Sequence, residues 1–150
     1  MEKLSDPMVQ NFLTLEPLDR ERLREAVLDP AAGAVLVFEG TVRNHSDGIT
    51  GIIALEYEAQ SQMASKLIEK IISQTLATFP ICHIALQHRL GRVELGEPTI
   101  IIAVSSAHRD EAYRASRFLI DEIKHNAPIW KREIFADGKS QWSQGCRAHG

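Results

Sequence analysis

The chain has 150 residues, which is enough for one domain built around a single hydrophobic core. Hydrophobic residues make up 44% and charged residues 25%, as in an ordinary globular protein. The net charge of −3 argues against a non-specific nucleic-acid binder, because that role needs a basic surface. No apolar stretch approaches the roughly 20 residues of a membrane span, and the N-terminus does not resemble a signal peptide. We therefore expect a cytoplasmic protein that binds neither nucleic acid nor membrane.

The cysteines and histidines do not form a metal-binding pattern. Cys82 lies in an apolar run, where we expect a small core residue, and Cys146 lies in a polar tail. Their spacing suggests neither a structural zinc site nor a disulfide. The six histidines include no HExxH motif, and the chain has no P-loop or GxGxxG motif. We expect activity without a metal or an organic cofactor.

The first part of the chain predicts a small N-terminal segment followed by two strands. Within residues 1–32, residues 8–15 are typical of a strand and residues 16–30 of a helix, with Pro17 near its first turn. The β-branched runs at residues 33–43 and 52–59 predict strands. Turn formers fill residues 44–51 between them and predict a loop.

The second part alternates helices and strands. Apolar residues at helical spacing predict helices at residues 61–79, with Ser61 as a possible cap, and at residues 110–125. Strands are expected at the remaining apolar runs, and Asp137-Gly138 signals a hairpin whose second strand reaches Trp142. These remaining strands are residues 81–91, 99–107 and 128–135, and residues 143–150 are expected to be a flexible tail.

The order of these elements predicts the fold class. From residue 33 it runs strand, strand, helix, strand, strand, helix, strand, in a single domain of residues 1–150. Two long helices with several strands between them favour an α+β fold, with the helices on one face of a mainly antiparallel sheet. The nearest simple pattern is a ferredoxin-like core with an extra N-terminal element.

Basic residues mark the candidate site, although several have ordinary explanations. Arg43 could be a solvated charge at a strand end, and Lys124 could complement the negative end of a helix dipole. The pair His108-Arg109 lies where a strand meets a helix, and free backbone N–H groups at such a junction favour an anion. A lysine close to other cations becomes a usable acid, base or nucleophile. The basic clusters are Arg43-Asn44-His45, His108-Arg109, Lys124, and Lys131-Arg132 followed by Glu133.

Five sequence segments resemble the catalytic large subunit of the molybdopterin synthase family. The combination of VSSAHR with IK and APIWKRE is specific, and the similarity spans residues 33–142. The segments are FEGTVRNH (38–45), LEYEA (55–59), HRLG (88–91), VSSAHR (104–109) and IKHNAPIWKRE (123–133).

The resemblance implies a fold, an activity and an assembly. The fold would be an α/β hammerhead, which is a ferredoxin-like core with an added subdomain. The activity would be a sulfurtransferase reaction of molybdenum cofactor biosynthesis, which converts precursor Z, a cyclic pyranopterin monophosphate, into molybdopterin. The sulfur would come from a small carrier subunit that ends in a Gly-Gly thiocarboxylate. The large subunit would form a homodimer with one carrier on each protomer, a heterotetramer.

The resemblance also implies roles for individual residues. Lys124 and Lys131 would be the catalytic lysines. Many bacterial members have Lys where this chain has Thr41, so a contact there would be made by the hydroxyl or the backbone. The substrate-binding residues would be Thr41, Val42, Arg43, His108 and Arg109, with Arg132 and Glu133 lining or supporting the pocket.

Two alternatives stay open from the residues alone. Arg43-Asn44 could hold phosphate and orient water in a hydrolase of small phosphate esters or acyl phosphates on a ferredoxin-like core. A non-enzymatic ligand-sensing or RNA-binding module is the other alternative, but an aromatic content of 6% argues against RNA.

Overall fold

A computed structural model describes residues 11–143 of the chain. The beginning of the predicted first strand, the tail after Ser143 and Cys146 lie outside these residues. In chain order the elements are β1 (Leu13–Thr14), α3 (Arg20–Glu25), β2 (Ala34–Thr41), β3 (His45–Ser46), β4 (Ile49–Thr50), β5 (Ile52–Ala59), α4 (Ser61–Thr78), β6 (His83–Arg89), β7 (Gly91–Glu94), β8 (Pro98–Ser106), α5 (Arg109–Asn126), β9 (Ile129–Phe135) and β10 (Ser140–Trp142).

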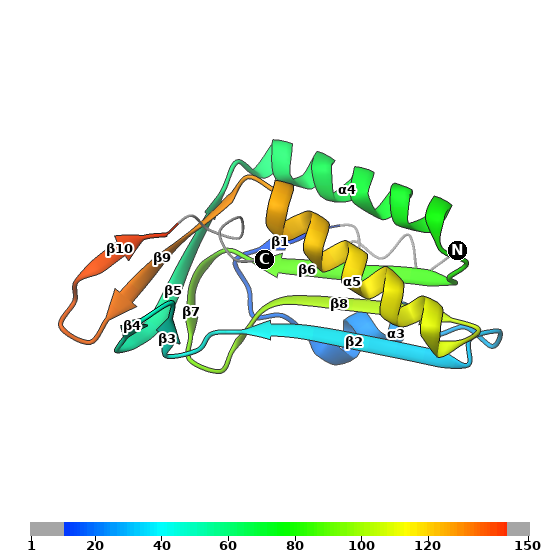
Figure 1. The fold of residues 1–150 in the computed structure, drawn as a ribbon, viewed down its shortest axis with the longest axis horizontal. Helices are drawn as coiled ribbons and strands as arrows, with labels where there is room; N and C mark the ends of the chain where they lie inside the picture. The colour runs from blue at the N-terminus through cyan, green and yellow to red at the C-terminus, as the bar shows by residue number, and fades with distance from the viewer. Residues whose placement is uncertain (1–10, 144–150) are drawn as a thin grey trace.

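The larger layer of the molecule is a four-stranded sheet in the order β1-β6-β8-β2. Its strands pair antiparallel, apart from the parallel pair β1 and β6. The long helices α4 and α5 cover one face of this sheet, and the short helix α3 packs against β2, β6 and β8 (Figure 1). The predicted packing of two long helices on one face is confirmed.

The sequence of β8 explains why this sheet is covered on both faces. Successive side chains of a strand point to opposite faces. Ile102 and Val104 belong to the core cluster that includes α4 and α5. Ile101 and Ala103 belong to the cluster around α3. Because both faces are buried, residues 100–104 of β8 are an uninterrupted apolar run and lack the alternation of a half-exposed strand.

A second four-stranded sheet, in the order β10-β9-β5-β7, stands at an angle to the first (Figure 1). The chain from β5 to β9 keeps the ferredoxin-like order of strand, helix, strand, strand, helix, strand, with β7 inserted between β6 and β8. In an undivided ferredoxin-like sheet β5 would lie beside β8, but β2 occupies that place and β7 pairs with the outer side of β5. The single sheet expected from the sequence is therefore split, and the second sheet forms the added subdomain.

The predicted N-terminal helix is too long and one predicted cap is wrong. The helix α3 covers only Arg20–Glu25, because the Asp19 side chain caps it by accepting a hydrogen bond from the Arg22 backbone N–H at 3.1 Å. At the start of α4 the cap is Gln60, which accepts from the Met63 N–H at 3.2 Å, and Ser61 is already helical.

Two short strand pairs were not predicted. The segment expected to be a loop contains the β3–β4 hairpin, whose turn residues Asp47 and Gly48 have φ of 47° and 84°. Positive φ at both positions is the geometry of a type I′ turn, which Asp-Gly favours. The run that was expected to end near Gly91 turns there, at a φ of 81°, and continues as β7.

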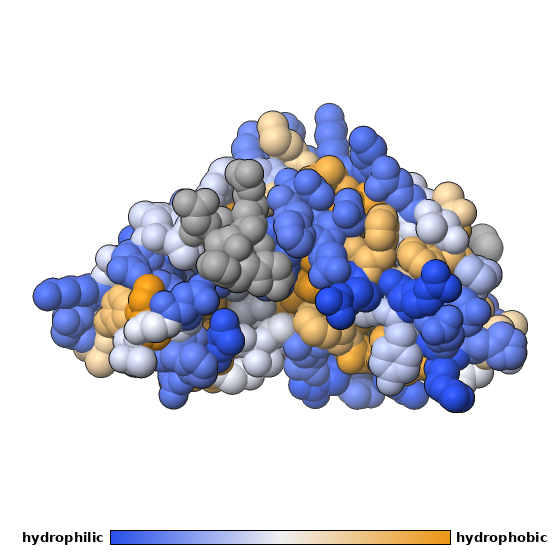
Figure 2. Space-filling view, in the orientation of Figure 1, coloured by the Kyte–Doolittle hydropathy of each residue, from blue (hydrophilic) through white to orange (hydrophobic). Residues whose placement is uncertain are grey.

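The surface of the helix layer is largely hydrophilic, with apolar patches between the polar side chains (Figure 2). Among the described residues, no helix is long and apolar enough to span a membrane.

Candidate active site

A broad cavity of about 1130 Å³ opens between the two sheets. Its walls come from the end of β2, the β3–β4 hairpin, the inner face of the second sheet and the second half of α5. The lining residues are Phe38, Gly40, Thr41, Arg43, His45, Ser46, Asp47, Ile49, Ile52, Leu55, Tyr57, Thr99, Arg117, Ile120, Asp121, Lys124, Trp130, Lys131, Glu133, Gln141, Trp142 and Ser143.

Helix α5 contributes two cations to the cavity: Lys124, which the sequence analysis named, and Arg117, which it did not. Arg117, Asp121 and Lys124 all line the cavity. They recur at the spacing of one helical face. Lys124 is half-buried, whereas Arg117 is exposed and its Nε lies 3.3 Å from the Asp121 carboxylate. Arg117 and Asp121 were missed, although helical spacing counted back from Lys124 would have been enough to find them.

Strand β9 brings Lys131 and Glu133 to the cavity on one face of the second sheet. Residues two apart on a strand share a face. Across the strand pair, Lys131 lies opposite Tyr57 and Glu133 opposite Leu55. Glu133 is only 2% exposed, and its carboxylate accepts a hydrogen bond of 3.0 Å from the Gln141 side-chain amide on β10. The second sheet thus holds a buried carboxylate two residues from the half-buried Lys131.

The segment after β2 brings Thr41 and Arg43 into the same cavity, both with exposed side chains. Val42 between them is 3% exposed and belongs to the core. Its N–H donates to the Glu97 carbonyl at 3.2 Å, and its carbonyl accepts from the Gly96 N–H at 2.9 Å. Val42 therefore anchors the segment from which Arg43 extends.

Arg132 lies on the opposite face of the second sheet from Lys131. It forms an ion pair with Glu56, its partner across the strands, and its guanidinium lies 5.4 Å from the centre of the Trp142 ring. Trp142 itself lines the cavity, so Arg132 reaches the cavity only through that ring.

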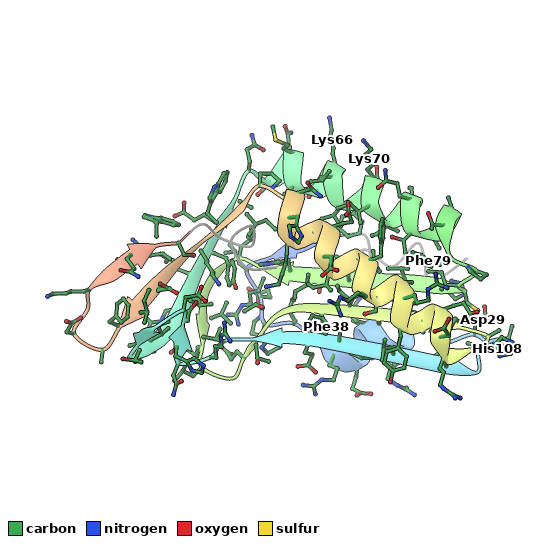
Figure 3. The ribbon with its side chains drawn as sticks, viewed as in Figure 1. Asp29, Phe38, Lys66, Lys70, Phe79 and His108 are labelled. Atoms are coloured by element: carbon green, nitrogen blue, oxygen red, sulfur yellow. The ribbon has the colours of Figure 1, made fainter. Side chains whose placement is uncertain are left out.

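His108 and Arg109 are not brought to the cavity within one chain. They are exposed at the start of α5, and neither is among the lining residues. Lys124 lies fifteen residues further along the same helix, so about 22 Å of helix separates it from Arg109. Figure 3 shows His108 at the end of the molecule away from β9 and β10, while the lining residue Phe38 lies nearer the middle.

One buried histidine stands directly behind the cavity wall. His88 on β6 is 2% exposed, and its ring meets Tyr57 edge-on with the centroids 4.8 Å apart. Burial, together with the positive charge of Lys124, lowers the pKa of His88 to about 4, although a hydrogen bond to the Arg89 backbone opposes the shift. The ring is therefore uncharged at neutral pH.

The sequence analysis missed the aromatic part of the wall. Tyr57 and Trp142 line the cavity, as does Trp130, which is 45% exposed. Single exposed apolar side chains are common on protein surfaces, so Trp130 indicates a binding site only once the cavity beside it is known. Within residues 11–143, no group of three or more His, Cys, Asp or Glu side chains is placed to hold a metal ion.

Comparison with known proteins identifies relatives over most of the chain. A molybdopterin synthase catalytic subunit from Thermoplasma volcanium is 45% identical over 85% of this chain and 90% of its own length. The human protein of the same name is 44% identical, over 89% of this chain and 70% of its own length. The crystal structure of molybdopterin synthase from Staphylococcus aureus superposes with a TM-score of 0.82 at 38% identity, covering 89% of this chain and 96% of that chain.

These relatives confirm the resemblance and give no support to the hydrolase alternative. The family model described as MoaE protein matches residues 13–126, which include the end of β2, all of α4 and α5, and Lys124. The chain belongs to the MoaE protein family.

Proposed function

We propose that this chain catalyses the sulfur-transfer step of molybdenum cofactor biosynthesis, converting precursor Z into molybdopterin. The observation that carries the proposal is the convergence of Arg43, Lys124 and Lys131, from three separate segments of the chain, on one cavity. Family membership and the names of the relatives support the same reaction.

The chemistry needs little from the protein beyond binding and proton transfer. A thiocarboxylate on a carrier subunit supplies the sulfur nucleophile, so the large subunit must hold a phosphate, orient the pterin and move protons. Arg43 is exposed where it lines the cavity and offers a planar fork that matches phosphate oxygens. Lys124 and Lys131 are half-buried, which places their amines where they can act as acids or bases on bound substrate.

The other residues assigned through the resemblance take supporting roles in this proposal. Thr41 offers a hydroxyl at the cavity wall, and Val42 anchors the backbone beside it. Glu133 is a buried acceptor that can fix a neighbouring ammonium group. Arg132 supports the wall by stacking on Trp142.

His108 and Arg109 can bind substrate only if they come from a second copy of the chain. About 22 Å of helix separates Arg109 from Lys124 of its own chain. We therefore propose a homodimer in which the start of α5 of one protomer completes the cavity of the other. In a symmetric dimer both sites are completed in the same way.

The partner is a small carrier subunit with a C-terminal Gly-Gly thiocarboxylate. The relatives of the present chain are named catalytic subunits, and this name implies assembly with another chain. The cationic side chains in the cavity favour entry of a negatively charged tail terminus.

The test is reconstitution with thiocarboxylated carrier and precursor Z, with the product measured by mass spectrometry. The wild-type chain should form molybdopterin, while Lys124→Ala and Lys131→Ala should lose most of the rate and still bind the carrier. Near-normal rates in both variants would show that these lysines are ordinary surface charges.

A further inference from the structure

Two of the sequence segments that carry the family resemblance have no role in the mechanism so far. These are LEYEA on β5 and HRLG at the end of β6, which belong to different sheets. They meet at one contact, where the ring of Tyr57 packs edge-on against the ring of His88, with an interplanar angle of 76°. This contact joins the first sheet to the second immediately behind the cavity.

Tyr57 links the contact to Lys131. The two residues are directly opposite each other in the β5–β9 pair, and both line the cavity. Directly opposed side chains on one face of an antiparallel pair have Cβ atoms about 5 Å apart. The Tyr57 ring is only 6% exposed, so it has little freedom to move away from the lysine beside it.

His88, on the other side of the contact, is anchored to the backbone of its own strand. Its Nδ1 lies 2.7 Å from the Arg89 carbonyl oxygen, and because a carbonyl can only accept, Nδ1 carries the proton. This hydrogen bond fixes the orientation of the ring. A protonated ring at this place would repel the ammonium group of Lys124, whereas a neutral ring supports the wall without adding charge.

We propose that Tyr57 and His88 are positioning residues that hold the amine of Lys131 in place for sulfur transfer, with the ring-to-ring contact as the essential element. The inference rests on the function proposed above. It assigns to the LEYEA and HRLG segments, which belong to different sheets, the placing of the lysine on β9.

A second ring pair in the same core provides a matched control. Phe79 and Phe118 pack with their centroids 5.7 Å apart, and neither residue lines the cavity. Phe118→Leu removes a ring contact of the same kind from the same helical layer. Its effect measures what the loss of core packing alone does to the enzyme.

The experiment compares four variants in steady-state assays with thiocarboxylated carrier and precursor Z. His88→Asn keeps an N–H donor for the Arg89 carbonyl but removes the ring edge, and Tyr57→Leu removes the other ring. Both should lower kcat by about tenfold to a hundredfold with the KM for precursor Z changed little, because misplaced catalytic groups slow the chemical step. Tyr57→Phe keeps the ring and should stay within about threefold of wild type, as should Phe118→Leu.

Several results would overturn the proposal. One is a kcat loss in Tyr57→Phe as large as that in Tyr57→Leu, since the hydroxyl would then be the important group. Another is a loss in Phe118→Leu equal to that in His88→Asn and Tyr57→Leu, which would reduce the contact to ordinary packing. If His88→Asn does not fold, the comparison of Tyr57→Leu with Tyr57→Phe tests the proposal by itself. A wild-type chain that forms no molybdopterin would instead refute the proposed function.

Discussion

Arg109 and Lys124 stand at opposite ends of α5, and this separation predicts how two inactive variants behave together. About 22 Å of helix separates the two residues, so one chain cannot present both to one substrate. We expect Lys124→Ala and Arg109→Ala to be nearly inactive when each is expressed alone. When the two chains are co-expressed, a mixed dimer has one cavity with both residues intact and one cavity with neither.

The size of the recovered activity follows from this geometry. Random pairing makes half of the dimers mixed, and each mixed dimer has one working site of two, which gives about a quarter of the wild-type activity. Purifying only mixed dimers, by a different affinity tag on each chain, should raise the value to about half. The assay is molybdopterin formation per mole of protein.

The reasoning fails if the purified mixed dimers are as inactive as either variant alone, because Arg109 would then serve its own chain or no site at all. The control is Arg114→Ala, on the same helix. Arg114 is exposed, pairs with Asp110 at 3.7 Å and does not line the cavity, so its loss should leave activity unchanged.

Three further predictions concern individual side chains. Arg43→Ala should raise the KM for precursor Z by about tenfold to a hundredfold, because it removes a charge-assisted hydrogen bond to phosphate; an unchanged KM would mean that Arg43 is only a solvated charge. Arg132→Ala should lower the midpoint of thermal unfolding and raise that KM less than Arg43→Ala does, since Arg132 stacks on Trp142 and pairs with Glu56. The pKa of His88 is about 4 in the folded chain and 6.5 as its ordinary value, so between these values the unfolded chain binds a proton that the folded chain excludes. The free energy of unfolding should therefore fall by about 3 kcal/mol as the pH drops from 6.5 to 4 on account of this residue, and denaturant titrations should show a smaller fall in His88→Phe.

Local periodicity was sufficient for the elements whose signal lies within a few turns. The helices α4 and α5 begin and end within one residue of the predicted ranges, because their apolar residues recur on one face and Pro80 and Pro128 follow them. The short strands β3 and β7 were missed, since two to four residues are too few to establish an alternation. The division into two sheets was missed for a different reason. Whether β5 pairs with β8 or with β7 depends on contacts between distant segments, which the pattern of each strand does not contain.

For the site, neighbouring residues in the sequence turned out to point to different surroundings. Lys131 and Arg132 are adjacent, so strand alternation allows only one of them to face the cavity. The sequence alone does not say which of the two it is. The register does, because Lys131 is opposite the cavity residue Tyr57, and Arg132 is opposite its ion-pair partner Glu56. The motif match therefore predicted both residues to belong to the site. Only the pairing of β5 with β9 shows that Lys131 is the acid–base candidate and that Arg132 supports the wall.

The same limitation applies over a longer range to the VSSAHR and IKHNAPIWKRE segments, which lie at the two ends of one helix. A motif reading grouped them into one site, but a straight helix keeps its two ends apart, whatever the chemistry of the side chains. Arg109 and Lys124 can then act together only across an interface between two copies. If they do, the active site is a property of the assembly, and the single chain folds the cavity with Lys124, Lys131 and Arg43 in place but without its second anion-binding group. A monomeric variant that keeps this cavity should for that reason retain the lysines and still fail to turn over.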